Sequence, residues 1–146
     1  MSAHALAYAR LRTEEGKRPR AYNDATGKTV TCQPGGNLSI AYGCNLETGL
    51  DDDEMNFLLD HRLTLVETAL QAFAWYTGLD DARASVFLDL GYNDGVPTLL
   101  HFVHTIAAAA AKDWQTAHDQ LLDSAAAREL PDRYQVLAQI ILTGVA

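Results

Sequence analysis

The sequence predicts an α+β protein that is mostly helical, with a small β-hairpin lobe and a larger helical lobe. Six of the ten glycines, two of the four prolines and both cysteines fall within residues 16–49. The same region contains two short runs of β-forming residues, Thr29–Cys32 and Leu38–Tyr42. Most of the remaining chain has apolar residues at helical spacing and few helix-breaking residues. With 146 residues and neither linker nor internal repeat, the chain is expected to form one domain.

The first helix is expected over residues 3–14, which are rich in Ala, Leu and Arg. A longer helix is expected to begin at Asp51-Asp-Asp-Glu54, because Asp51 can accept amide hydrogens of the first turn while Glu54 reaches back. Apolar residues then recur every three or four positions through Phe73. These boundaries divide the expected single domain, residues 1–146, into a β-rich lobe (16–50), a connecting helix (51–75) and a helical lobe (1–14 and 79–146).

A central helix is expected over residues 80–92, because this stretch is apolar nearly all round and would be packed on several sides. Within it, Asp89 is expected to be a structural acid paired with Tyr92 or with an arginine. Trp75 and Trp114 are expected to pack in the core or between the lobes. Shorter helices are expected at about 101–111, 114–123 and 132–142, the last beginning near Pro131 and ending before Gly144.

Several classes of protein are excluded by composition and spacing. The longest uncharged apolar stretch, 98–111, is too short and too polar to cross a bilayer, so no membrane insertion is expected. The N-terminal residues lack the pattern of a secretory signal. No metal site is expected, because Cys32 and Cys44 lack zinc-ligand spacing and His101 and His104 have no further ligand nearby. The two cysteines are either free thiols or a bridge across a Pro-Gly-Gly turn.

Three chemically suited side chains fall around the expected β-rich lobe. Glu15 lies at the end of the first helix, Asp24 in the turn after it, and Ser39 on the strand that follows. Two carboxylates that flank a ligand surface suit hydrolysis of a glycosidic bond, because one protonates the leaving oxygen while the other directs water or attacks the sugar. The spacing alone also fits a solvated Glu15 and an Asp24 that forms a turn with Gly27.

The strand expected at Leu38–Tyr42 has two different faces. Its bulky side chains alternate with small ones, which leaves one face nearly bare. Such a face would let an extended ligand approach the backbone closely. The bulky face would consist of Leu38, Ile40 and Tyr42, and the bare face of Ser39, Ala41 and Gly43.

The string Leu11-Arg-x-x-Glu15-Gly-x-Arg-x-x-x-Tyr22-x-Asp24 resembles the catalytic signature of the phage-type lysozymes, glycoside hydrolase family 24. In that family eight residues separate a Glu from an Asp, as they separate Glu15 from Asp24. The segment Ser39-Ile-Ala-Tyr-Gly43 is similar to the Thr-Ile-Gly-Tyr-Gly strand of the family. Further similarities cover most of the chain and lie at Leu90–Gly95, Lys112–Trp114, Ser124, Pro131, Arg133 and Thr143–Gly144.

The resemblance implies a lysozyme-like fold with a saccharide cleft between the lobes. It also implies an endolysin-like muramidase that hydrolyses, by inversion, the β-1,4 bond between N-acetylmuramic acid and N-acetylglucosamine in bacterial peptidoglycan. Glu15 would be the general acid, Asp24 would polarise the attacking water, and Ser39 would help hold that water. Arg133 would sit beside Glu15, and apolar burial of Glu15 would have to oppose this cation to keep the acid protonated. The supporting or substrate-binding residues would be Tyr22, Ala41, Gly43, Asn93 and Arg133.

The partners implied by the resemblance are peptidoglycan glycan strands, bound by a monomer without a cofactor. The formal net charge of −8 excludes a protein that binds nucleic acid through a basic groove. Residues 1–30 nevertheless carry six basic and three acidic side chains, so we expect a locally basic catalytic edge whose activity falls only modestly as salt rises. Without a signal, such an endolysin would accumulate in the host cytoplasm and reach the periplasmic wall through a holin lesion, or be carried in a virion.

Departures from the family pattern support an alternative. Ala41 replaces a glycine, Cys44 replaces a His or Arg, Ala126 falls where an aromatic is common, and the hairpin between Asp24 and Ser39 is nine residues longer. The alternative is a catalytically impaired lysozyme-fold module that binds peptidoglycan or helps to build a virion. A second alternative, an acidic helical interaction protein, leaves the segment from Glu15 to Gly43 unexplained.

Overall fold

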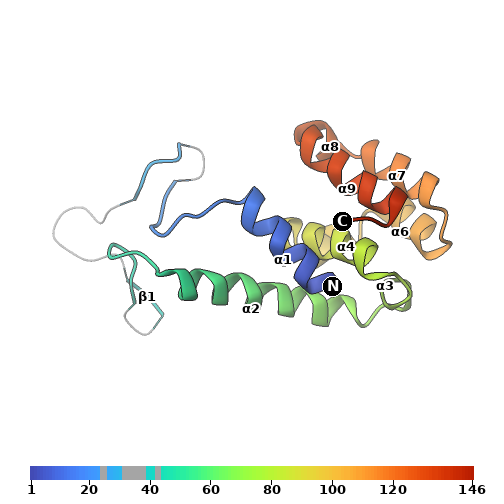
Figure 1. The fold of residues 1–146 in the computed structure, drawn as a ribbon. Helices are drawn as coiled ribbons and strands as arrows, with labels where there is room; N and C mark the ends of the chain where they lie inside the picture. The colour runs from blue at the N-terminus through green and yellow to red at the C-terminus, as the bar shows by residue number, and fades with distance from the viewer. Residues whose placement is uncertain (24–25, 31–38, 42–43) are drawn as a thin grey trace.

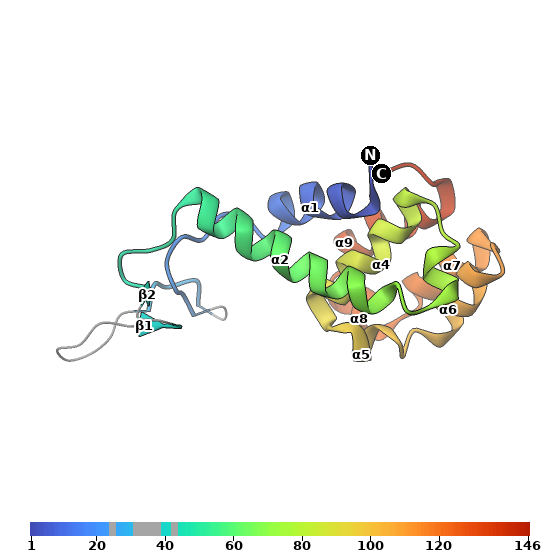
Figure 2. The same ribbon diagram turned by 90° about the horizontal axis from the view of Figure 1, so that it is seen from below.

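The computed structural model describes residues 1–23, 26–30, 39–41 and 44–146. The described chain is mostly helical with a small antiparallel sheet of two strands, which agrees with the expected α+β composition. Figures 1 and 2 show the sheet at one end of the long helix α2 and the other helices gathered around its opposite end. In chain order the elements are α1 (Ala3–Glu14), β1 (Ser39–Ile40), β2 (Cys44–Asn45), α2 (Asp52–Leu70), α3 (Ala74–Thr77), α4 (Asp81–Asp94), α5 (Val96–Leu99), α6 (Val103–Ala110), α7 (Trp114–Leu122), α8 (Ala125–Glu129) and α9 (Pro131–Thr143).

The helix α2 begins at the expected capping box. The Asp51 carboxylate accepts the Glu54 N–H at 2.8 Å, and the Glu54 carboxylate accepts the Asp51 N–H at 2.9 Å. The helix ends at Leu70, however, so the expected end at residue 75 is wrong. Phe73 lies in the turn that leads into α3 and packs against the core, with its ring centroid 6.1 Å from that of Trp75. Phe73 is partly buried in this turn and continues the apolar spacing of α2, so the spacing alone could not reveal where the helix ends.

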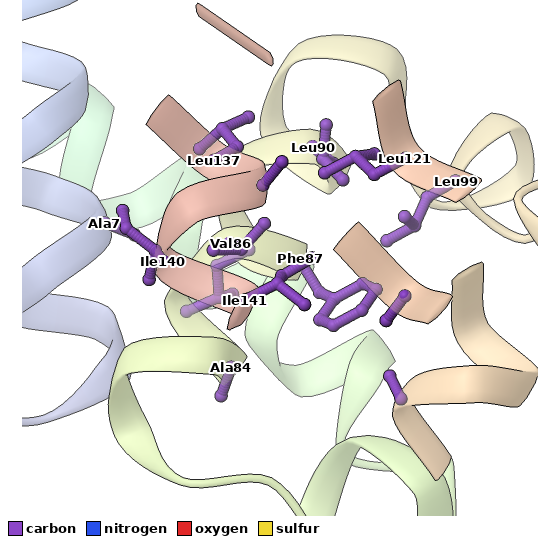
Figure 3. Close-up of a cluster of buried hydrophobic side chains, with 14 of the residues drawn as sticks. Ala7, Ala84, Val86, Phe87, Leu90, Leu99, Leu121, Leu137, Ile140 and Ile141 are labelled. Carbon is purple, nitrogen blue, oxygen red and sulfur yellow. The ribbon is translucent and has the colours of Figure 1, made fainter. Parts of the chain in front are cut away.

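The helix α4 is the centre of the core, as expected. Every residue from Ala84 to Gly91 is buried, and the helix packs against α1, α2, α5 and α9. Figure 3 shows Val86, Phe87 and Leu90 of α4 among side chains of the C-terminal helices. A Cβ added at Gly91 would lie 2.7 Å from Cγ1 of Val66 on α2, so this glycine permits the close approach of the two helices.

The C-terminal half contains the three expected helices, as α6, α7 and α9, and two short helices that were not expected, α5 and α8. With four and five residues, these two are shorter than the window over which helical periodicity is recognised. The last helix begins with Pro131 in its first turn and ends at Gly144, whose φ of 72° is left-handed.

The sheet differs from the expected hairpin. Strand β1 pairs antiparallel with β2, with Ser39 opposite Asn45 and Ile40 opposite Cys44. The strand ends at Ile40 rather than including Ala41 as expected, because the chain turns at Ala41, whose φ of +52° lies in the left-handed region. Leu38, Tyr42 and Gly43 lie outside the described residues, and Ile40 is 58% exposed, so this part of the bulky face is not buried.

The segment between α1 and α2 also pairs with itself. Tyr22 and Thr29 form an isolated antiparallel bridge, and the Val30 N–H donates to the Ala21 carbonyl at 2.8 Å. Thr31 and Cys32, the rest of the expected run of β-forming residues, lie outside the described part of the chain. The described buried apolar side chains all come from helices, and residues 16–50 contribute none of them.

The sequence predicted neither a membrane-spanning helix nor a metal site. None of the helices built from the described residues is both long enough and apolar enough to cross a membrane. Among the same residues, no three His, Cys, Asp or Glu side chains gather where they could hold a metal ion. Cys44 forms no disulfide with another described residue, and Cys32 lies outside this set.

Candidate functional site

A cleft of about 380 Å³ lies between the C-terminal end of α1, the segment that follows it, and the first half of α2. Figures 1 and 2 both show α1 and α2 side by side. Apolar side chains of both helices form part of the lining, and charged and aromatic side chains form the rest. The lining residues used below are Leu11, Arg12, Glu15, Lys17, Arg18, Tyr22, Asp52, Arg62 and Tyr92.

Glu15 follows the last residue of α1 and lines the cleft. Its N–H donates to the Leu11 carbonyl at 2.9 Å, and Gly16, with a φ of +68°, then turns the chain away from the helix axis. Nη1 of Arg133 on α9 donates to the Glu15 carboxylate at 3.3 Å, so the contact implied by the resemblance is present. The expected apolar burial of Glu15 is wrong: its side chain is 46% exposed because it lies beyond the helix end at an open cleft.

Asp89 holds Arg133 from the opposite side. Its carboxylate is fully buried and accepts hydrogen bonds from Nη2 of Arg133 and, at 2.7 Å, from Nε of Arg10. The expected structural acid is therefore confirmed, with arginines rather than Tyr92 as partners. Burial would lower the pKa of Arg133, but the hydrogen bond and the charge of Asp89 raise it, so the guanidinium stays charged.

Two further hydrogen bonds complete this network. Nδ2 of Asn93 donates to the Asp89 backbone oxygen at 2.9 Å, and Nη2 of Arg10 donates to the Ser85 backbone oxygen at 2.8 Å. Asn93, a supporting residue by resemblance, thus contacts Asp89 within α4. The network connects α1, α4 and α9 and holds the Arg133 guanidinium beside the cleft.

The adjacent carboxylates Glu14 and Glu15 have different surroundings. The Glu14 side chain is 26% exposed and lies 3.6 Å from Nη2 of Arg133. Burial and then the charge of Asp89 raise the pKa of Glu14, against the opposing charges of Arg133 and Arg10. Of the two, Glu15 is the more exposed and is the one that lines the cleft.

The remaining predicted site residues are only partly brought together. Tyr22 lines the cleft, with its ring under the Arg18 guanidinium at 5.2 Å. Ser39 and Ala41 are exposed on the β1 hairpin and do not line the cleft. Asp24 and Gly43 lie outside the described residues, so their predicted roles stay predictions.

Sequence reasoning missed two residues that line the cleft, Tyr92 and Arg62. Burial and then the charge of Glu15 raise the pKa of Tyr92, whereas Arg62 opposes them, so these groups act on one another across the cleft. Arg62 belongs to none of the motifs, and Tyr92 lies within the Leu90–Gly95 segment without having been assigned to the site. The sequence offered one signal for Arg62. It lies three residues after the apolar Leu59 on the same helix, and this spacing puts both residues on one helix face, at the edge of the cleft.

No protein-family model matches this chain, and no curated protein matches it. A half-exposed carboxylate beside a charged arginine can exchange a proton with a bound ligand, and the open cleft admits an extended one.

A second hollow, of about 440 Å³, lies between the α5–α6 and α7–α8 regions. Its histidines, His101 and His104, are exposed, in agreement with the expected surface positions. The carboxylate that lines it, Asp123, lies 3.7 Å from Nη1 of Arg128. Neither Glu15 nor Ser39, the candidate catalytic residues that the structure describes, lines this hollow.

Proposed function

We propose that the protein is a lysozyme-like muramidase that hydrolyses the β-1,4 bond between N-acetylmuramic acid and N-acetylglucosamine in peptidoglycan. The observation that carries this proposal is the place of Glu15: a carboxylate at the end of α1 that lines an open cleft and is held by Arg133. The resemblance of residues 11–24 to the phage-type lysozymes supports the same function independently of that geometry.

In the proposed reaction, Glu15 donates its proton to the glycosidic oxygen as the bond between this oxygen and the anomeric carbon breaks. Asp24 takes a proton from a water molecule, whose oxygen forms the new bond at the anomeric carbon. Water must fit between Asp24 and the sugar for inversion, which requires about 6.5–9.5 Å between the two carboxyl groups. The hydroxyl of Ser39 would help to hold this water.

Arg133 has a positioning role in this proposal. Because Asp89 holds one nitrogen of its guanidinium, the other is directed at the Glu15 carboxylate. Arg133 thus fixes the orientation of the carboxylate that lines the cleft.

The experiment compares wild type, Glu15→Gln and Glu14→Gln on purified peptidoglycan, with released fragments identified by mass spectrometry. We expect wild type and Glu14→Gln to release muropeptides with reducing muramic acid ends. Glu15→Gln should release at least about a hundredfold less, because a general acid contributes on that order. Glu14→Gln is the matched control, since it also removes a carboxylate beside Arg133 but not the one that lines the cleft. Equal release by all three proteins would exclude Glu15 as the acid.

One observation favours a second candidate function, a catalytically impaired module that binds peptidoglycan. Ala41 takes a left-handed φ of +52° where the lysozyme pattern has glycine, so a methyl group occupies a strained position in the β1 hairpin. In the same experiment, co-sedimentation of wild type with peptidoglycan without release of any fragment would support this second function and exclude the muramidase.

A further inference from the structure

The arginines that line the cleft differ from the other arginines in their partners. Every described arginine outside the cleft, except Arg20, forms an ion pair with a carboxylate. Three arginines line the cleft, and none of them forms an ion pair with another described residue: Arg12, Arg18 and Arg62. Acidic side chains outnumber basic ones by 19 to 11 in this chain. A shortage of carboxylates therefore does not explain why three guanidinium groups in one cleft have no described carboxylate partner.

The two described carboxylates that line the cleft do not compensate these charges. Glu15 is paired with Arg133, and Asp52 is paired with Lys17. Each of these acids thus already has its own cation. The described lining of the cleft therefore has an excess of positive charge, within a protein whose net charge is −8.

The unpaired guanidinium groups come from both sides of the cleft. Arg12 belongs to α1 and lies 5.7 Å from the ring centroid of Tyr8, while Arg18 follows α1 and lies 5.2 Å from that of Tyr22. Arg62 belongs to α2. Contacts with aromatic rings hold a guanidinium in place but leave its N–H groups available. A planar guanidinium can donate two parallel hydrogen bonds to a carboxylate or phosphate.

We propose that the cleft binds glycan strands through their anionic substituents, and that Arg12, Arg18 and Arg62 make it selective for carboxylate-bearing over neutral β-1,4-linked glycans. In peptidoglycan these carboxylates belong to the peptide stems. The choice of a glycan rests on the proposed function, whereas the preference for an anion rests on the charges of the cleft. The phosphates of wall-linked polymers share the oxyanion chemistry, and the experiment separates the two sources.

The test measures binding rather than turnover. Glu15→Gln serves as the parent protein, and its co-sedimentation is measured with three insoluble materials. These are peptidoglycan stripped of phosphate polymers, the same material with its carboxylates amidated by a carbodiimide and methylamine, and chitin. Into this parent are introduced Arg12→Gln, Arg18→Gln and Arg62→Gln, singly and together. Arg20→Gln is the matched control, because Arg20 also forms no ion pair with a described residue but does not line the cleft.

We expect each single cleft substitution to weaken binding to the stripped peptidoglycan about two- to fivefold, since exposed charge pairs contribute on that scale. The triple substitution and the amidation should each weaken it at least about tenfold, and the triple variant should no longer distinguish native from amidated material. Arg20→Gln should bind as the parent does. Urea unfolding of the triple variant at the parent midpoint would show that it is folded.

Equal binding of the parent to native and amidated peptidoglycan would overturn the proposal. A loss with Arg20→Gln as large as that with the cleft variants would also overturn it, as would binding that disappears when phosphate polymers are stripped. Failure of the proposed hydrolysis is distinguishable: wild type would release no fragments, yet the dependence of binding on the arginines and the carboxylates would be unchanged.

Discussion

Asp89 is the residue on which the geometry of the candidate site depends most. Its carboxylate is fully buried, and the two guanidinium groups that contact it, those of Arg10 and Arg133, are 11% and 18% exposed. Removal of the negative charge leaves both cations with a neutral partner in a poorly solvated place. The ion pair is thus needed to keep this arrangement of side chains. This holds whether or not apolar residues at the same positions would give a larger free energy of unfolding.

We predict that Asp89→Asn lowers the free energy of unfolding by about 3–5 kcal/mol, as expected when one partner of a buried ion pair is removed. Urea denaturation followed by circular dichroism measures this loss. Asp81→Asn, at an exposed position in the first turn of the same helix, is the control and should lie within about 0.5 kcal/mol of wild type. A loss for Asp89→Asn no larger than that of the control would contradict the structural role.

The sequence identified some of these residues and missed others for a physical reason. The position of Asp89 in an apolar helix was enough to predict a paired acid, with either Tyr92 or an arginine as its partner, and the resemblance placed Arg133 beside Glu15. The second cation, Arg10, depends on how α1 crosses α4, and a one-dimensional pattern does not specify a crossing. The burial expected for Glu15 failed for the same kind of reason, because the opening beside α1 is made by α2 and by the segment after Gly16.

The helix α6 ends at a residue with an unusual backbone conformation. At the end of α6, Lys112 has a φ of 60°, its N–H donates to Ala109 at 3.0 Å, and the Asp113 N–H donates to Ala108 at 2.9 Å. This is a Schellman motif with a lysine at the position that glycine favours. The turn between α6 and α7 therefore contains backbone strain that a substitution can relieve.

Lys112→Gly is predicted to raise the free energy of unfolding by about 1 kcal/mol, because glycine adopts the left-handed conformation without steric cost. The neighbouring Ala111→Gly is the matched control: Ala111 has a φ of −80°, so glycine there should lower stability by about 1 kcal/mol. Chemical denaturation of both variants measures the difference. A destabilised Lys112→Gly would show that the lysine side chain, rather than its backbone, determines stability at this turn.

Gly91→Ala is predicted to lower the free energy of unfolding by about 1–3 kcal/mol, because the new Cβ would lie 2.7 Å from Val66 in a closely packed helix crossing. Gly78→Ala provides the comparison. Its φ is −87°, and the nearest atom to an added Cβ lies at 3.4 Å, an ordinary contact, so it should change stability by less than about 0.5 kcal/mol. Thermal unfolding of the pair tests this, and equal melting temperatures would show that α2 and α4 can move apart at no cost.

The long helices were predictable because each carries its own signals, and the short elements were not. The Asp51 capping box and the apolar run after Asp80 indicate their helices without reference to the rest of the chain. By contrast, α5 and α8, with four and five residues, are too short to show helical periodicity. The turn at Ala41 was unpredictable since alanine is not a residue that favours a left-handed φ.

The charges of the folded protein act in opposite directions as pH changes. Burial would raise the pKa of Asp80, but hydrogen bonds and the charge of Arg83 together hold it below its ordinary value of 3.8. Its contribution to stability is therefore present above that value and is lost as pH falls through the lower pKa of the folded state. Glu14, whose pKa is raised from 4.5, has the opposite sign: folding is disfavoured by its charge as pH rises above 4.5.

Two variants should separate these contributions in unfolding measured between pH 3 and pH 7. Glu14→Gln should be more stable than wild type at pH 7, with a difference that disappears as pH falls below the ordinary value of 4.5. Asp80→Asn should be less stable than wild type at pH 7, with a difference that shrinks below the ordinary value of 3.8. Differences that do not vary with pH would show that packing, rather than ionisation, distinguishes the variants.

The described residues of 16–50 contribute no buried apolar side chain, which separates this part of the cleft lining from the core of the scaffold. Folding depends on helices that tolerate few changes, whereas Arg18, Arg20 and Tyr22 can be exchanged with little effect on the core. Such a division lets a chain acquire new specificities by drift at a few exposed positions while its scaffold stays intact. It also makes Arg18 and Tyr22, which line the cleft, a natural choice for a combinatorial library aimed at redirecting the cleft to other polymers.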